Sequence, residues 1–338
     1  MKEILQKCIE GRTLSESEAE SVMKDIMEGK VSDSQIASLI TILRFRGETV
    51  DEMAGFAKAM KEHMTQLSGF EHAIDTCGTG GDGASTFNIS TASAILASSL
   101  GVKVAKHGNR AVSSKSGSAD VLEYLHIPIQ TTPEEAKRAL EETNMSFLFA
   151  PLYHSSMKHV AKARQEVGFR TIFNFLGPLA NPANAKRQVI GVSSLNHAEK
   201  MAETLKRFGS EHVLFVTSED GLDEISISAE TNIIELKDGT IAKYKISPEQ
   251  FGFERGRLAD VQVSNVQESA KMIEEVLQNK RQDSVKNIVV LNSAAALYIA
   301  GKAEDLQKGV EMAAKAIEEG TAYRQLKRLM VRKEESYA

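Results

Sequence analysis

The hydrophobic positions of the first sixty-odd residues recur at helical spacing. Ser15 and Glu18 form a capping-box pattern, and apolar side chains then return every three or four residues until Gly29. Two further segments with the same kind of start and the same spacing follow. The pattern predicts a small bundle of three helices over residues 1–64, and the polar stretch 65–72 is a natural boundary after it.

From residue 73 onward, short apolar runs alternate with helical segments. This alternation is typical of an α/β domain with a largely parallel sheet. Residues 231–246 instead predict an antiparallel hairpin around Asp238 and Gly239. We therefore expect a small N-terminal helical domain and a larger α/β domain over residues 73–338, whose central, mostly parallel sheet is surrounded by helices. The expected buried strands are residues 102–105, 146–150, 189–193, 212–217 and 287–292.

Composition narrows the class of protein. The chain has 338 residues, is 42% hydrophobic and carries a net charge of 41 minus 46, or −5, which speaks against a nucleic-acid partner. No apolar run approaches the roughly 20 residues of a membrane span, and the N-terminus turns acidic before any signal-like region develops. We expect a cytoplasmic protein with no membrane partner. Cys8 and Cys77 are too few for a disulfide framework or a thiolate metal site.

A glycine cluster is the most unusual feature of the sequence. Four glycines fall within six positions of "DTCGTGGDGASTFNIST" and match the pattern G-x-G-x-x-G. A dinucleotide site would also require an acidic residue about 20 positions later. Lys106, His107 and Arg110 occupy that region instead, which points to a more anionic ligand. The four glycines are Gly78, Gly80, Gly81 and Gly83.

The cluster leads into a helix that we expect to begin near Ser90 and Thr91. Helix N-termini offer unpaired N–H groups and a partial positive charge, and Thr86 and Asn88 add polar side chains. Each charge-assisted hydrogen bond to a phosphate contributes about 1.5–3 kcal/mol, so several offset the cost of ordering the glycines. The segment therefore predicts a phosphate site.

A second polar loop, "KHGNRAVSSKSGSAD" over residues 106–120, follows the next predicted strand. Consecutive parallel strands usually lie side by side, and ligands of α/β sheets bind at the carboxyl ends of strands. Both glycine-containing loops should therefore face one crevice, where together they would hold a polyphosphate.

These motifs resemble the anthranilate phosphoribosyltransferase family. The resemblance rests on the two loops, on "RTIFNFLGPLANP" at residues 170–182 and on "GLDE" at residues 221–224. It implies transfer of the 5-phosphoribosyl group from phosphoribosyl pyrophosphate (PRPP) to the amine of anthranilate, with release of pyrophosphate, in tryptophan biosynthesis. It further implies two Mg²⁺ ions per subunit, a homodimer joined through the helical domain, and helices from about residues 152–169 that join that domain.

The resemblance also assigns roles to individual residues. Arg164 would hold the anthranilate carboxylate, with Gly78 and Asn109 also touching anthranilate. Lys106 and His107, with the magnesium sites, would stabilise the leaving group and the transition state. The magnesium contacts would be Ser90, Asp223 and Glu224. The PRPP contacts would be Gly78, Gly81, Asp82, Thr86, Asn88, Ile89, Ser90, Thr91, Lys106, His107, Gly108, Asn109, Arg110, Ala111, Val112, Ser113, Ser114 and Ser118.

One position departs from the family pattern, and several alternatives stay open. His154 and Ser155 stand where the family usually has His-Pro, which affects the entrance for anthranilate. From the residues alone, Arg164 also fits a solvated helix face, and Asp223 with Glu224 an acidic surface turn. The alternative functions are a pyrimidine nucleoside phosphorylase, a related transferase that uses another aromatic amine, and a non-catalytic sensor that binds the donor.

Overall fold

The N-terminal segment folds as four helices. The computed structural model describes residues 1–111 and 115–330. Capping boxes begin α2 at Ser15 and α4 at Thr49, and Gly47 ends α3. The sequence pattern missed α1, which is short and has no side-chain cap at its start. The four helices are α1 (Lys2–Ile9), α2 (Glu16–Met27), α3 (Asp33–Arg46) and α4 (Val50–Glu62).

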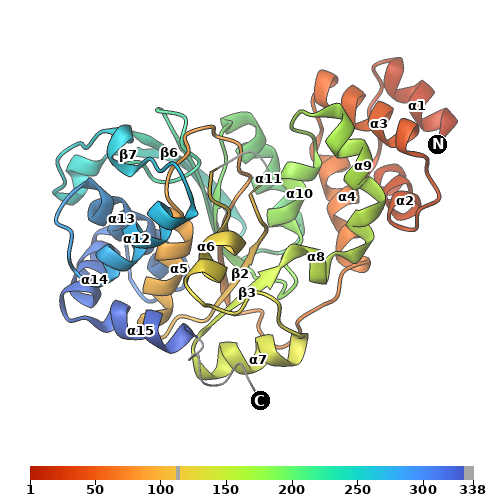
Figure 1. Ribbon diagram of the computed structural model, residues 1–338. Coiled ribbons are helices and arrows are strands. Elements are labelled where there is room, and N and C mark those ends of the chain that lie inside the picture. The colour runs from red at the N-terminus through yellow and green to blue at the C-terminus, as the bar shows by residue number, and fades with distance from the viewer. Residues whose placement is uncertain (112–114, 331–338) are drawn as a thin grey trace.

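A later part of the chain returns to this bundle. Helix α9 packs against α2 and α3, and its Val160 and Ala163 are buried in the same core as the apolar faces of the N-terminal helices. Figure 1 shows α9 at the same end of the molecule as α1 to α4. The returning segments are α8 (Ala150–Tyr153), a 3₁₀ turn (Ser155–Met157), α9 (Lys158–Val167) and α10 (Phe173–Leu179).

The central sheet has seven strands in the order β3-β2-β1-β4-β5-β6-β7. The first five are parallel, and β6 and β7 close the sheet as an antiparallel hairpin whose turn is Asp238 and Gly239, as the sequence predicts. The mostly parallel α/β fold is therefore confirmed. The strands are β1 (Ile74–Gly78), β2 (Val104–Gly108), β3 (Met145–Phe149), β4 (Arg187–Gly191), β5 (His212–Ser218), β6 (Thr231–Lys237) and β7 (Thr240–Ile246).

The expected strand at residues 287–292 is wrong, because this run lies inside helix α13 (Ser284–Ile299). The helix is buried on nearly all sides, so its sequence has no polar face and lacks the helical periodicity that would distinguish it from a buried strand. Conversely, β1 is not among the predicted strands, because Ile74 is its only large apolar side chain.

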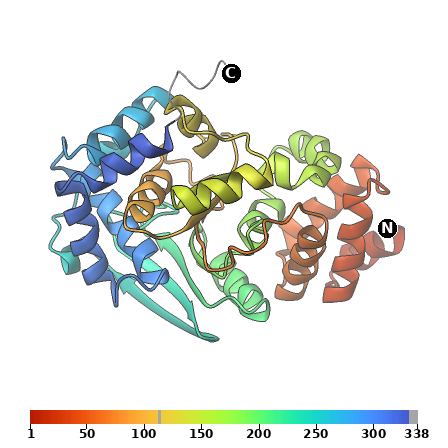
Figure 2. The ribbon, with the colours of Figure 1, turned by 90° about the horizontal axis from the view of Figure 1, so that it is seen from below.

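Helices cover both faces of the sheet (Figures 1 and 2). On β5, Leu214 packs into the core that contains α5 and α13, whereas its neighbours Val213 and Phe215 pack into the core shared with α10, α11 and the bundle. This alternation is the period-2 pattern of a strand buried on both faces. The remaining helices are α5 (Ile89–Ser99), α6 (Ser118–Tyr124), α7 (Pro133–Glu142), α11 (Leu195–Arg207), α12 (Val266–Leu277), α14 (Leu306–Glu318) and α15 (Thr321–Leu329), with 3₁₀ turns at Pro248–Phe251 and Leu258–Val261.

Across residues 1–111 and 115–330, none of these helices combines the length and the apolar character needed to cross a membrane.

Candidate active site

The order of the strands creates a topological switch point in the middle of the sheet. Strand β1 has β2 on one side and β4 on the other. The order in which successive strands are added to the sheet therefore reverses between β1 and β4. Open α/β sheets bind ligands at such a switch point, outside the carboxyl ends of the strands. Gly78 and Gly191 pair with each other at these ends, and the loops that follow β1, β2, β4 and β5 all leave from them.

Asp223, after β5, lies directly over the switch point. A Cβ placed on Gly191 would come within 1.7 Å of the Asp223 carbonyl oxygen, and one on Gly78 within 2.7 Å of Oδ2. The backbone N–H of Gly80 donates to the same Oδ2 at 3.0 Å. These glycines are therefore required by the close approach of the aspartate, in addition to any role in ligand binding.

Three acidic side chains interact at this point. Burial and, after it, the nearby Asp82 together raise the pKa of Asp223 to about 7. Burial and the charge of Asp223 raise the pKa of Glu224 to about 8. Carboxylates crowded in this way are poorly compensated by the protein itself, and a bound cation would favour their ionised form.

Lys106 and Ser90 connect the two glycine loops. The Lys106 side chain is 2% exposed, and its ammonium donates to the Thr76 carbonyl and, at 3.1 Å, to Ser90 Oγ. Burial lowers the pKa of Lys106, while the charges of Asp75 and other neighbouring groups oppose that effect. The Lys106 side chain thus extends from β2 to the first turn of α5. In the same turn, a hydrogen bond from the Ser90 backbone to Glu224 lowers the pKa of that carboxyl.

The start of α5 lies where the sequence predicts it. Asn88 precedes the helix, but its side chain makes no cap; Nδ2 donates to Ser116 Oγ at 2.8 Å and so ties the first loop to the second. Thr86 forms an isolated bridge with Gln262, and Ile89 is buried in the core. The buried Oγ1 of Thr91 has no hydrogen-bond partner among the described residues, so this predicted donor contact has a free polar atom.

The second loop packs closely against the start of α6. A Cβ on Gly108 would come within 2.5 Å of Ser118 Oγ, which donates to the Asn109 carbonyl at 3.2 Å. Ala111 and Arg110 both donate to Asp120, so the Arg110 guanidinium is held by surface carboxylates in this structure. The predicted contacts Val112, Ser113 and Ser114 lie outside the described residues.

His107 is part of a buried network behind the loops. Its backbone N–H donates to Asp75 Oδ1 at 3.1 Å, and Asn181 donates to the other Asp75 oxygen at 2.8 Å. The rings of His107 and His154 are 5.1 Å apart. Burial lowers the pKa of His107 to about 3 and that of His154 to about 4, so both rings are neutral at physiological pH. His107 therefore offers a neutral imidazole, whose Nε2 has no partner in the described chain.

Arg164 lies on α9, which comes from the bundle side of the molecule. Its guanidinium is 5.5 Å from the centre of the Phe173 ring, and burial lowers its pKa. Within the described residues it forms no ion pair with a carboxylate of the chain. Arg164 is thus not a simple solvated residue, and its charge is available to an external carboxylate.

Arg170 is a feature that the sequence analysis missed. Its guanidinium donates to Ser193 Oγ at 2.8 Å, to Thr79 Oγ1 at 3.2 Å and to the Gly81 carbonyl at 3.2 Å. It therefore fastens the glycine turn to the loop after β4. The motif "RTIFNFLGPLANP" begins with this residue, but nothing in the sequence indicates that its side chain reaches back across 89 positions.

The acidic side chains suit Mg²⁺ only together with a ligand. No group of three or more His, Cys, Asp or Glu side chains in the described part of the chain forms a ready-made metal site. Mg²⁺ commonly uses one or two carboxylates and completes its shell with water and substrate phosphates. Asp223 and Glu224 fit that arrangement because their raised pKa values show uncompensated negative charge.

Comparison with known proteins first defines a class. The family model "Glycosyl transferase family, a/b domain" matches residues 70–323, and "Glycosyl transferase family, helical bundle domain" matches residues 2–64. The site at the switch point therefore belongs to a glycosyl-transferring α/β protein that carries a helical bundle.

Individual relatives define the family more narrowly. The anthranilate phosphoribosyltransferase of Geobacillus sp. (strain WCH70) is 63% identical over 337 residues, covering 100% of this chain and 99% of the relative. In a crystal structure, the anthranilate phosphoribosyltransferase of Thermus thermophilus is 40% identical with a TM-score of 0.90, covering 96% of this chain and 97% of that one. The Saccharomyces cerevisiae protein in complex with PRPP and Mg is 27% identical with a TM-score of 0.87, covering 96% and 95%. The chain belongs to the anthranilate phosphoribosyltransferase family.

Proposed function

We propose that this chain transfers the 5-phosphoribosyl group of PRPP to the amine of anthranilate and releases pyrophosphate, as a step of tryptophan biosynthesis. The observation that carries the proposal is the meeting of two glycine loops and a buried acidic turn at the switch between β1 and β4. The 63% identity to a named member of the family over the full chain supports the choice of substrates.

The two loops would hold the donor through backbone N–H groups and the side chains at the start of α5. The unpartnered Thr91 Oγ1 and the buried Lys106 ammonium are suited to phosphate oxygens. We propose the whole set named above as the donor site, including the segment from Val112 to Ser114. Arg110 would leave its ion pairs with Asp120 and Glu123 and bind the donor instead.

The reaction requires charge stabilisation more than a strong nucleophile. As the bond between the anomeric carbon and pyrophosphate breaks, positive charge develops on the sugar and negative charge on the leaving group. Lys106 would stabilise the leaving group from beneath the loops. The amine of anthranilate is neutral and attacks directly, while the neutral His107 can accept a hydrogen bond from it.

Arg164 would bind the carboxylate of anthranilate and so fix the direction of its amine, with Gly78 and Asn109 completing the acceptor contacts. Two Mg²⁺ ions, held by Asp223, Glu224 and Ser90 together with donor oxygens, would neutralise the pyrophosphate charge. We further propose that residues 1–64 with the helices around 152–169 form one domain and residues 73–338 the other, and that the enzyme works as a cytoplasmic homodimer joined through its helical domain.

The test is a direct assay. Protein, Mg²⁺, PRPP and anthranilate are mixed, and the loss of anthranilate fluorescence is followed together with the release of pyrophosphate. We expect both signals in Mg²⁺, neither in EDTA, and no phosphorolysis of thymidine or uridine. Donor binding without pyrophosphate release in the presence of anthranilate would contradict the proposal and favour a sensor.

A further inference from the structure

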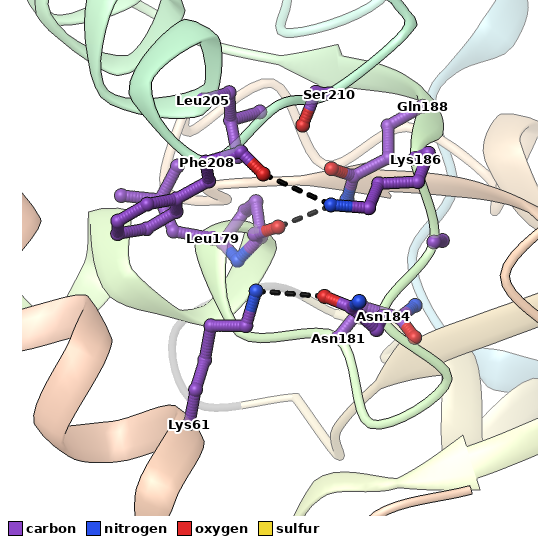
Figure 3. A pocket seen from close by; sticks show the side chains of 11 residues that line it. Lys61, Leu179, Asn181, Asn184, Lys186, Gln188, Leu205, Phe208 and Ser210 are labelled. Atoms are coloured by element: carbon purple, nitrogen blue, oxygen red, sulfur yellow. Dashed lines mark hydrogen bonds between the residues drawn. The ribbon is translucent and has the colours of Figure 1, made fainter. Parts of the chain in front are cut away.

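A polar pocket lies at the amino ends of the parallel strands, whereas the two glycine loops lie at their carboxyl ends. It is formed where β4 begins, between the end of α4, the end of α11 and the segment between α10 and β4 (Figure 3). Its empty space is about 260 Å³ when the open solvent at its mouth is included, so the enclosed part is small and suits only a small ligand. The lining residues on which the inference depends are Lys61, Asn184, Lys186, Phe208 and Ser210.

Two lysines from different parts of the fold converge on this pocket. Lys61 extends from α4, and its ammonium donates to Asn184 Oδ1 at 2.7 Å and lies 5.1 Å from the centre of the Phe208 ring. Lys186 precedes β4 and donates to the Phe208 carbonyl at 2.9 Å. Each ammonium has three N–H donors, so two on each lysine remain after these bonds.

Neither lysine has an acidic partner in the described part of the chain. Within residues 1–111 and 115–330, neither Lys61 nor Lys186 forms an ion pair with a carboxylate, and their hydrogen bonds go to an amide oxygen and a carbonyl oxygen. Lys186 contributes to the lowered pKa of Glu71, after hydrogen bonds from the backbone, but the two form no ion pair. Burial, followed by the charge of Lys186, lowers the pKa of Lys61 to about 8. Two positive charges thus face each other with only neutral oxygens between them.

The neighbouring polar groups add donors. Asn184 accepts from Lys61 through its oxygen, which leaves its Nδ2 free to donate, and Ser210 contributes a hydroxyl. Lys186 can be explained in part as a cap for the carbonyl at the end of α11. That role does not explain Lys61, which belongs to a different helix and has spare donors directed at the same space.

We propose that this pocket binds a small oxyanion, held between Lys61 and Lys186. The shared chemistry is that of inorganic phosphate and of small carboxylates, both of which accept several charge-assisted hydrogen bonds. A bound anion would join α4 to the start of β4 and so link the helical bundle to the sheet. Since the pocket lies at the amino end of β4, it is separate from the loops that follow the carboxyl ends.

The test is isothermal titration calorimetry with inorganic phosphate and, separately, acetate. Each is added to the wild-type chain and to the variants Lys61→Gln, Lys186→Gln, Lys61→Arg and Lys206→Gln. Lys206→Gln is the matched control, because it removes the same charge from an exposed position in the last turn of α11. Phosphate bound at the donor loops is common to all variants, so the difference between isotherms reports on the pocket.

We expect at least one of the two anions to bind about tenfold more weakly to Lys61→Gln and to Lys186→Gln, equivalent to about 1.4 kcal/mol. Lys61→Arg and the control Lys206→Gln should bind as the wild type does. The same anion should raise the melting temperature of the wild type more than that of Lys186→Gln. Isotherms that are the same in all variants for both anions would overturn the proposal. A cooperative thermal unfolding transition shows that each variant is folded. Because Lys61→Gln and Lys186→Gln are tested separately, misfolding of one of them leaves the other as a test.

Discussion

At the scale of the residue, the site combines charges that the fold leaves uncompensated. Arg164 rests on the Phe173 ring without an acidic partner in the described chain, and Asp223 and Glu224 hold protons more tightly than ordinary carboxylates do. Each of these groups has unused capacity for a ligand of opposite charge. Such perturbed groups in a crevice are typical of functional sites.

Replacing Arg164 with alanine should affect the acceptor more than the donor. Loss of charge-assisted hydrogen bonds worth about 1.5–3 kcal/mol should raise the KM for anthranilate roughly 10- to 100-fold. The KM for PRPP should change little. Steady-state kinetics with each substrate varied in turn measures both constants.

The matched control is Lys162→Ala on the same helix, where the lysine forms a surface ion pair with Asp33 at 3.4 Å. Surface pairs of this kind contribute little, so both KM values should stay near those of the wild type. Equal increases of the two KM values in Arg164→Ala would remove Arg164 from the acceptor pocket.

The sequence predicted many of these residues, but not their partners. Gly78 and Asp223 were assigned by resemblance, whereas their contact across the switch point depends on the order of the strands. The role of Arg170 could not be predicted from the sequence, because its bonds to Thr79 and Gly81 join segments about 90 positions apart. Long-range side-chain contacts of this kind leave no local pattern in a sequence.

At the scale of the element, the ends of the strands place the chemistry. Strand β4 ends at Gly191, beside the end of β1 and beneath the turn that carries Asp223. The hairpin and the first helices followed from local signals, namely the turn at Asp238 and Gly239 and the capping boxes. Helix α13 did not, because a helix buried on all sides has the composition of a strand and no polar face.

Adding one methyl group at Gly191 tests this placement. In Gly191→Ala, the new Cβ would come within 1.7 Å of the Asp223 carbonyl oxygen, so the acidic turn must move. We expect a loss of about 1–3 kcal/mol or more in the free energy of unfolding, measured by urea denaturation, and a higher Mg²⁺ concentration for half-maximal activity.

Gly177→Ala is the control, since a Cβ at Gly177 meets no atom within 4 Å. It should keep the wild-type stability and Mg²⁺ requirement. If Gly191→Ala behaved as Gly177→Ala does, the close approach of Asp223 to β4 would be refuted.

His154, between α8 and the following 3₁₀ turn, should make the stability of the fold depend on pH. The pKa of buried His154 is about 4, below its ordinary value of 6.5. Between these values the unfolded chain binds more protons than the folded one, so stability falls as the pH is lowered. The full effect of this group is on the order of 3 kcal/mol.

In His154→Gln, the free energy of unfolding should therefore depend less steeply on pH between about 6.5 and 4. Urea denaturation at several pH values measures this slope. His72→Gln, which removes an exposed histidine, is the matched control. An unchanged slope in His154→Gln would show that this ring does not stay neutral in the folded protein.

At the scale of the whole molecule, the proposed reaction draws on residues of both the bundle and the sheet. The donor loops belong to the sheet, whereas Arg164 comes from a helix that packs against α2 and α3. One hydrophobic core runs from the bundle through α10 and α11 to one face of the sheet. The pocket that contains Lys61 and Lys186 lies along the same boundary, at the amino end of β4.

The position of the bound donor is the most direct test of the proposed function. A crystal of the chain soaked with PRPP and Mg²⁺ should show the pyrophosphate between residues 78–91 and 106–118, with metal density beside Asp223 and Glu224. Donor density anywhere else on the molecule, or donor in the crevice with no metal near these carboxylates, would contradict it.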